Sequence, residues 1–175
     1  IGWMSVFRMI TNARWTILKM EKFNWSSKKV LVTGAGGFIG SHLTERLVEL
    51  GAHATALIEY NSLGRWDWIE ESLFKNDIEV VMGDIRDSES LRKTFRRQEI
   101  VFHLAALIGI PYSYETPLSY VQTNVMGTLN VLRAALENNV ERFIHASTSE
   151  VYGTAKYVPI DENHPLNAQS PYAAT

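Results

Sequence analysis

The chain has 175 residues, 46% hydrophobic and 21% charged, and its 17 Lys and Arg residues against 19 Asp and Glu residues give a net charge of −2. This length suits one globular domain, and the nearly balanced charge gives no electrostatic reason to bind nucleic acid or an anionic membrane. The absence of cysteine excludes disulfides and thiol catalysis, and no apolar run approaches the ~18 residues of a membrane span, so we expect a cytoplasmic protein.

The first 28 residues differ in composition from the rest of the chain. They begin with Ile1 and scatter Arg and Lys residues among Trp, Met and Ile, with Glu21 as their one acidic residue. Such a segment is typical of an organellar transit peptide, and an extension upstream of a native start at Met20 is the alternative. We expect residues 1–28 to be a non-native or disordered extension and residues 29–175 to form the domain.

From residue 29 onward, short apolar runs alternate with patterns of helical period. Strands are predicted at 29–33, 54–58, 78–82, 100–104 and 140–146, and helices at 38–50, 66–74, 88–95 and 117–138. Strands that alternate with helices imply right-handed crossovers and a parallel sheet covered on both faces. We therefore predict an α/β fold with a doubly wound parallel sheet, the Rossmann arrangement.

A glycine-rich turn follows the first predicted strand and leads directly into the first helix. Gly34, Gly37 and Gly40 have the spacing G-x-x-G-x-x-G, and Phe38 and Ile39 lie between the last two. Glycines in such turns allow a tight bend, let backbone N–H groups approach a pyrophosphate at the helix N-terminus, and bring helix and strand together. Glycines also form ordinary loops, but the strand before and the helix after favour a dinucleotide-binding site.

The end of the second strand bears on which dinucleotide binds. In dinucleotide-binding folds an acidic residue at this place binds the ribose 2′-hydroxyl of NAD, whereas a basic residue receives the 2′-phosphate of NADP. Glu59 follows the strand at 54–58, and the nearest downstream basic residue is Arg65. Because a carboxylate repels a phosphate, we predict NAD, with NADP as the alternative. A solvated strand-end residue is the other interpretation of Glu59.

Six motifs in order along residues 29–175 resemble those of the extended short-chain dehydrogenase/reductases, the family of nucleotide-sugar epimerases and dehydratases. After the glycine turn come G-D-I-R-D (83–87), F-H-L-A-A (102–106), T-N-V-M-G-T (123–128), S-T-S-E-V-Y-G (147–153) and S-P-Y-A-A-T (170–175). The resemblance implies a nucleotide-sugar substrate and a homodimer. It also assigns cofactor contacts to Asp84, Ile85, Leu104, Ala105, Ala106, Asn124, Ser147 and Tyr172. His103, at a strand end, is expected to be structural.

The resemblance further assigns four catalytic residues: Thr148, Ser149, Glu150 and Tyr172. It implies that Tyr172 is a general base for a sugar hydroxyl, that the Thr148 hydroxyl binds the C4 oxygen, and that Glu150 removes the C5 proton. Ser149 departs from the T-D-E form of this motif and agrees with the T-S-E form of GDP-mannose-type dehydratases. Residues 60–62 and 110–114 most resemble 4,6-dehydratases of legionaminic-type pathways, which act on nucleotide-activated N-acetylglucosamine.

The tyrosine motif of the family is Y-x-x-x-K, which places a lysine one helical turn after the tyrosine. The ammonium group favours the phenolate and so lowers the pKa of the phenol. The chain ends at Thr175, three residues after Tyr172. We therefore expect a domain cut at the start of the catalytic helix, without the C-terminal substrate portion and with little or no turnover.

Other functions stay open beside a 4,6-dehydratase. A UDP-glucuronate decarboxylase also carries T-S-E, but it needs a basic pocket for the sugar carboxylate, and residues 108–116 contain no Arg or Lys. A 4-epimerase would leave Glu150 without a role. A non-catalytic NAD(P)-binding module is the alternative from a different class. The histidines show no metal-ligand spacing, so we predict no metal site.

Overall fold

The centre of the protein is a parallel sheet of five strands. In the computed structural model, which describes residues 23–175, the strands stand in the order β3-β2-β1-β4-β5. They are β1 (Lys29–Thr33), β2 (His53–Glu59), β3 (Glu79–Gly83), β4 (Ile100–His103) and β5 (Arg142–His145). Every pairing is parallel, and Val32 of the central strand lies opposite Ala56 of β2 and Phe102 of β4. This strand order confirms the predicted doubly wound fold.

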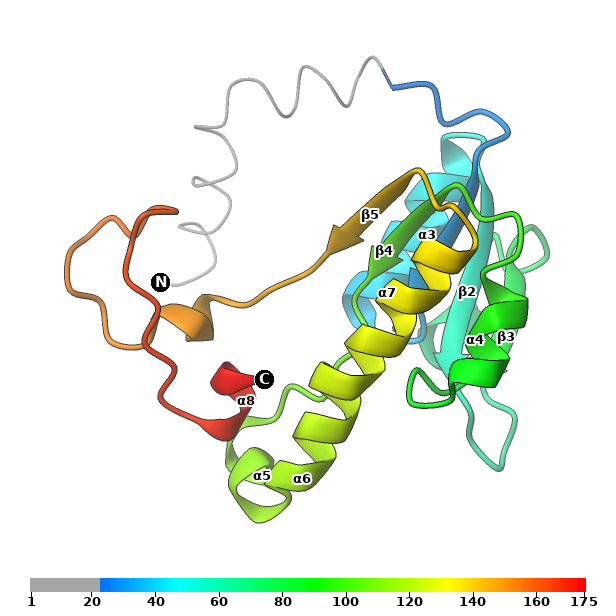
Figure 1. Ribbon diagram of the computed structural model, residues 1–175. Coiled ribbons are helices and arrows are strands. Elements are labelled where there is room, and N and C mark those ends of the chain that lie inside the picture. Colours follow the sequence, from blue (N-terminus) through cyan, green and yellow to red (C-terminus); the bar gives the residue numbers. More distant parts are fainter. Residues whose placement is uncertain (1–22) are drawn as a thin grey trace.

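Helices cover both faces of this sheet (Figure 1). On one face lies α3 (Phe38–Glu49), and on the other lie α4 (Ser88–Thr94) and α7 (Thr128–Glu137). The short helices α5 (Ile110–Glu115), α6 (Pro117–Tyr120) and α8 (Pro171–Ala174) lie away from the faces of the sheet, and the chain also forms the short turns η1 (Asp67–Glu71) and η3 (Ser149–Tyr152). Alternate residues of β1 point to opposite faces, so Val30 packs in one core with Leu47 of α3, whereas Leu31 packs in the other with Val131 of α7. The two cores hold the strand ends in fixed positions.

The long helix predicted at 117–138 is a composite. A π-helical segment, η2 (Val121–Gly127), lies between α6 and α7. The short helix α5, which the sequence did not predict, comes directly before α6. π-helical turns widen the backbone and occur frequently at functional sites. Here the widened turn carries Asn124, which is buried.

The helix predicted at 66–74 was wrong in type and length, because the segment forms only the 3₁₀ turn η1. The backbone N–H of Trp68 donates to the Gly36 oxygen at 3.3 Å, so this segment bonds to the glycine turn as well as within itself. Asp67 has a φ of 51°, in the left-handed region that interrupts a regular helix. The segment therefore lies against the glycine turn.

The predicted extension, residues 1–28, lies mainly outside the described residues. The part that the structure describes packs on the domain. The Trp25 ring lies 6.2 Å from the Phe102 ring, centroid to centroid, and the Lys28 ammonium forms an ion pair with Glu99. The packed unit therefore starts before Lys29, the boundary that the sequence predicts.

After β5 the chain leaves the sheet and returns (Figure 1). It passes through η3, makes a long loop, and ends in α8 beside α5 and α6. The Tyr114 hydroxyl donates to the Gln169 oxygen at 2.8 Å, and the rings of Tyr120 and Tyr172 meet edge to face at 6.3 Å. These contacts bring Tyr172 back to the carboxyl ends of the strands.

Candidate active site

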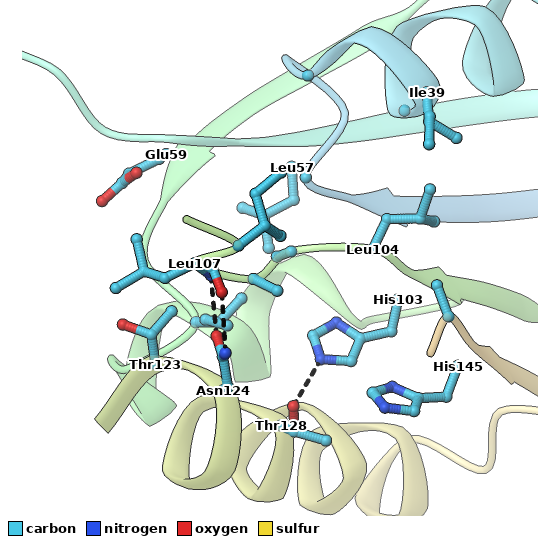
Figure 2. Close-up of a pocket in the computed structure, with 18 of the residues that line it drawn as sticks. Ile39, Leu57, Glu59, His103, Leu104, Leu107, Thr123, Asn124, Thr128 and His145 are labelled. Atoms are coloured by element: carbon cyan, nitrogen blue, oxygen red, sulfur yellow. Dashed lines mark hydrogen bonds between the residues drawn. The ribbon is translucent and has the colours of Figure 1, made fainter. Parts of the chain in front are cut away.

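A cavity of about 790 Å³ lies at the carboxyl ends of the strands. Ligands of doubly wound sheets bind in this position, where the strand order reverses between β1 and β4. Among the residues predicted for the cofactor, those that line it are Gly34, Gly37, Phe38, Ile39, Gly40, Glu59, Asp84, Ile85, Leu104, Ala105, Ala106, Asn124, Ser147 and Tyr172. Figure 2 shows the cavity between the glycine turn above and the helix that carries Asn124 below.

The glycine turn is shaped by close contacts that a side chain would break. Gly34 has a φ of 70°, and a β-carbon on it would lie 2.8 Å from the Ala105 nitrogen. A β-carbon on Gly40 would lie 2.2 Å from the Gly34 oxygen. Within the described chain, no side chain caps the N-terminus of α3 at Gly37. The first amides of α3 therefore face the cavity at the positive end of the helix dipole, an arrangement suited to a pyrophosphate.

Three charged side chains line the cavity near the ends of β2 and β3. The Arg86 Nε donates to both carboxylate oxygens of Asp84, at 3.0 and 2.8 Å. Hydrogen bonding to Arg86 lowers the pKa of Asp84, and the Asp84 carboxylate, with a smaller effect of Glu59, raises the pKa of Arg86. The guanidinium is therefore engaged, and Glu59 presents a negative charge where an adenosine ribose would lie.

Asn124 contacts backbone, although it lines the cavity. Its amide oxygen accepts from the Leu107 nitrogen at 2.9 Å, and its Nδ2 donates to the Leu107 oxygen at 3.0 Å and to the Thr175 hydroxyl at 3.1 Å. Thr175 in turn donates to the Tyr172 oxygen at 3.0 Å. Asn124 therefore ties the cavity wall after β4 to the helix that carries Tyr172.

His103 sits under the cavity floor with only 1% of its surface exposed. Both ring nitrogens have hydrogen-bond partners, Thr33 at 2.7 Å and Thr128 at 3.0 Å, and the second bond is drawn in Figure 2. Burial, and secondarily the stacked His145 ring, lower the pKa of His103 to about 4. This burial and the two internal hydrogen bonds are what a structural role of His103 predicts, although the residue also borders the cavity.

The four residues predicted to be catalytic divide into two groups. Thr148 and Tyr172 line the cavity together with the glycine turn. Ser149 and Glu150 are exposed in η3 and do not belong to the lining, although Val151 next to them does. The Thr148 hydroxyl accepts the Glu150 backbone N–H at 3.2 Å, which fixes the start of the turn that holds the carboxylate.

Most of the described chain is similar to known proteins. Residues 31–175 match the family model described as GDP-mannose 4,6 dehydratase. The chain belongs to this family. Membership confirms the resemblance to the extended short-chain dehydrogenase/reductases, while similarity to legionaminic-type enzymes in particular stays a prediction.

Relatives within this family differ in activity. The chain is 39% identical over 126 residues to a UDP-N-acetyl-alpha-D-glucosaminuronate decarboxylase of Bacillus cytotoxicus, with 72% of this chain and 38% of the relative covered. It is 38% identical over 149 residues to a UDP-glucose 4-epimerase of Mycolicibacterium smegmatis, with 83% and 47% covered. The chain thus spans less than half the length of these relatives.

A solved structure in the same family is a dehydratase. It is DesIV, a dTDP-glucose 4,6-dehydratase from Streptomyces venezuelae with NAD and TYD bound, 33% identical, with a TM-score of 0.75 over 83% of this chain and 47% of that one. Dehydratase, epimerase and decarboxylase members therefore share the fold of residues 31–175. The common part is the dinucleotide domain, and the reaction is not distinguished by the likeness alone.

The cavity also includes residues that the sequence analysis did not single out for the site. They are Gly36, Leu57, Ile58, Asp67, Gly83, Arg86, Leu107, Ile108, Thr123, Thr128, His145, Ala146, Val151, Ala173 and Thr175, besides His103. Most lie next to a recognised motif, so proximity in sequence was the signal available for them. Asp67 has no such signal, since it reaches the site only because η1 bonds to the glycine turn.

Residues 23–175 contain neither a metal-binding cluster nor a membrane-spanning helix. In that part of the chain, no group of three or more acidic or histidine side chains is arranged to hold a metal ion. None of its helices is long and apolar enough to cross a membrane. The dinucleotide cavity is therefore the feature from which a function is best argued.

Proposed function

We propose that this chain is the NAD-binding part of a nucleotide-sugar 4,6-dehydratase. The observation that carries the proposal is one cavity lined by the glycine turn, by Thr148 and by Tyr172. This arrangement would put a dinucleotide beside a hydroxyl and a phenol, the groups needed to oxidise an alcohol. Solved relatives of the family with NAD bound support the cofactor.

NAD rather than NADP is supported by charge. Glu59 lines the cavity at the end of β2, where a 2′-phosphate would be repelled by its carboxylate. The adjacent cation, Arg86, is held by Asp84 through three side-chain hydrogen bonds and is not free to neutralise such a phosphate. The residues present therefore fit NAD.

For the reaction itself, each catalytic group has a proton to move or an oxygen to hold. When bound, NAD would accept a hydride from C4 of the sugar and return it to C6. Tyr172 takes the proton of the C4 hydroxyl, and the Thr148 hydroxyl holds the C4 oxygen. The resulting carbonyl acidifies the C5 proton. Glu150 removes this proton and passes it to the C6 hydroxyl, which leaves as water. Once the hydride is on C6, C5 takes a proton from solvent water, which completes the 4-keto-6-deoxy product. Because Glu150 is exposed in η3, its place beside the sugar depends on the bound substrate.

The nearest alternatives are decarboxylation and 4-epimerisation, because relatives with both activities match this chain. An epimerase needs no base to remove the C5 proton, so Glu150 is the residue that favours a dehydratase. A decarboxylase must bind the carboxylate that its sugar carries on C5, and α5 with its preceding loop contains no Arg or Lys to do so. We take nucleotide-activated N-acetylglucosamine as the substrate.

The test uses the protein extended to the full length of its relatives. UDP- or GDP-N-acetylglucosamine should give a 4-keto-6-deoxy product. This product is detected by its absorbance in alkali. Glu150→Gln should stop the loss of water while reduction of NAD stays detectable. Release of CO₂ from UDP-glucuronate would show a decarboxylase, and a C4 epimer formed equally well by Glu150→Gln would show an epimerase.

A homodimer completes the proposal. The outer face of η2 and α7 exposes large apolar side chains: Val121, Val125, Met126, Leu129, Leu132 and Leu136. Contiguous exposed apolar residues of this kind mark interaction surfaces. Two copies of the helix could bury this face against each other, as the family resemblance implies.

A further inference from the structure

The wall of the cavity that follows β4 is held by one helix through two contacts. Asn124 in η2 bonds to both backbone groups of Leu107, and Thr128, four residues later at the start of α7, bonds to His103 at 3.0 Å. Residues four apart lie on the same side of a helix. The two contacts therefore fasten both ends of segment 103–107, which lines the cavity throughout.

The hydrogen bonds around His103 determine which of its two ring nitrogens carries the proton. The Thr33 hydroxyl oxygen, fully buried, accepts the backbone N–H groups of Leu104 and Ala105, each at 3.2 Å. The proton of that hydroxyl has one partner in the structure, the His103 Nδ1 at 2.7 Å. A buried hydroxyl donates its proton rather than leave it unpaired, so Nδ1 is the acceptor. A neutral ring then carries its proton on Nε2 and donates it to Thr128.

The surroundings of the ring keep it neutral. The groups packed against it are Thr33 from β1, Thr128 from α7, and Phe143 and His145 from β5, and no carboxylate is among them. A second proton on the ring would point at the Thr33 hydroxyl proton and displace it. Burial and the neighbouring His145 oppose that proton, consistent with the lowered pKa.

We propose that His103, as the neutral Nε2–H tautomer, is a positioning residue for the dinucleotide site. It orients the Thr33 hydroxyl so that the oxygen receives the Leu104 and Ala105 amides, which keeps the Ala105 backbone against Gly34. The two backbones are so close there that a β-carbon on Gly34 would lie 2.8 Å from the Ala105 nitrogen. Because Gly34 and Ala105 both line the cavity, a small shift of the Ala105 backbone changes the width of the cavity. The proposal rests on the dinucleotide function proposed above.

His103 acts through backbone and not on the ligand itself. Its ring is 1% exposed, and both nitrogens are used inside the protein. A residue that acts only on stability would lower the free energy of unfolding without altering the affinity of the folded site. A positioning residue changes that affinity according to which of its two bonds is lost.

Two substitutions of His103, by asparagine and by glutamine, each keep one of its two hydrogen bonds and remove the other. The side-chain oxygen of asparagine falls near the position of Nδ1 and keeps an acceptor for Thr33, whereas the amide nitrogen of glutamine falls near Nε2 and keeps a donor for Thr128. Each variant leaves one partner hydroxyl unpaired, half-buried Thr128 in the Asn variant and fully buried Thr33 in the Gln variant, so both variants lower the stability of the fold. They differ in whether Thr33 stays oriented.

The measurement is NADH binding by this chain, followed by NADH fluorescence, with folding verified by near-ultraviolet circular dichroism. We expect His103→Asn to bind NADH within about threefold of wild type, and His103→Gln to bind at least about tenfold more weakly. In wild-type protein, ¹⁵N NMR of the histidine ring should show a proton on Nε2 and none on Nδ1, with or without NADH.

The outcomes separate the two proposals. Equal NADH affinity of folded Asn and Gln variants overturns the positioning role alone, as does a proton on Nδ1 at neutral pH. If wild-type protein with the expected tautomer binds no dinucleotide, the proposed function fails and the positioning role fails with it. The tautomer is read without any ligand, so the two failures are distinguishable.

Discussion

Gly40, in the first turn of α3, lies so close to Gly34 that a β-carbon on Gly40 would lie 2.2 Å from the Gly34 oxygen. This oxygen belongs to backbone and cannot move aside as a flexible side chain would. We expect Gly40→Ala to lower the free energy of unfolding by at least about 3 kcal/mol, because the helix must shift away from the turn. Urea denaturation measures the change.

Gly37→Ala is the matched control for that substitution. Gly37 has a φ of −74°, which alanine adopts freely, and its nearest non-adjacent atom would be 3.4 Å away. The free energy of unfolding should change by less than about 1 kcal/mol. Equal losses in the two variants would contradict the close approach of helix and turn.

The buried ring of His103 predicts a dependence of stability on pH. Its pKa is about 4 in the folded protein against 6.5 for a free side chain, so the unfolded chain binds more protons between these pH values. This contribution is complete above pH 6.5 and is lost as the pH falls toward 4. The free energy of unfolding should be about 2 kcal/mol lower at about pH 5 than at about pH 7. His103→Asn should remove this part of the slope, and an unchanged slope would refute the assignment.

Glu59 predicts the choice between the two dinucleotides. Wild-type protein should bind NADH at least about tenfold more tightly than NADPH, and Glu59→Ala should reduce that ratio by about tenfold because the repelling charge is gone. Glu49→Ala, at the far end of α3 from the glycine turn, should leave the ratio unchanged. A ratio unaffected by Glu59→Ala would mean that the carboxylate does not face the ribose.

The apolar face of α7 predicts self-association. The side chains of Leu132 and Leu136 are 44% and 80% exposed. If two copies meet there, Leu132→Glu places a charge in an apolar interface and should give monomers, whereas Arg133→Glu, on a neighbouring exposed position, should weaken the dimer less. Sedimentation equilibrium measures both. A monomeric wild-type protein at all accessible concentrations would contradict the dimer.

Much of the fold was predictable because its signals are local. The β-branched runs gave the five strands, and the glycine spacing placed the turn before α3. The π-helical segment was not predictable, since Val121, Val125 and Leu129 have a spacing that an α-helix fits equally well. The turn at 67–71 also depends on a distant contact, the bond from Trp68 to the Gly36 oxygen.

Some residues of the site were predictable from the sequence, and others were not. Glu59 was predicted from its place at the end of a strand and Asp84 from the family resemblance, and both line the cavity because strand ends meet at one edge of a parallel sheet. The bond between Thr33 and His103 joins residues 70 positions apart, and that between His103 and Thr128 joins residues 25 apart. No spacing rule connects such residues, so only the folded chain reveals that they form one network.

In the proposed function, the amides at the start of α3 bind the pyrophosphate of NAD. Titration calorimetry of wild-type protein with NADH and with NADPH tests it most directly, with Gly34→Ala as the variant that disturbs the turn. We expect one saturable NADH site and weaker binding of NADPH in the wild-type protein, and loss of both in Gly34→Ala. A well-folded wild-type protein that binds neither nucleotide would contradict it.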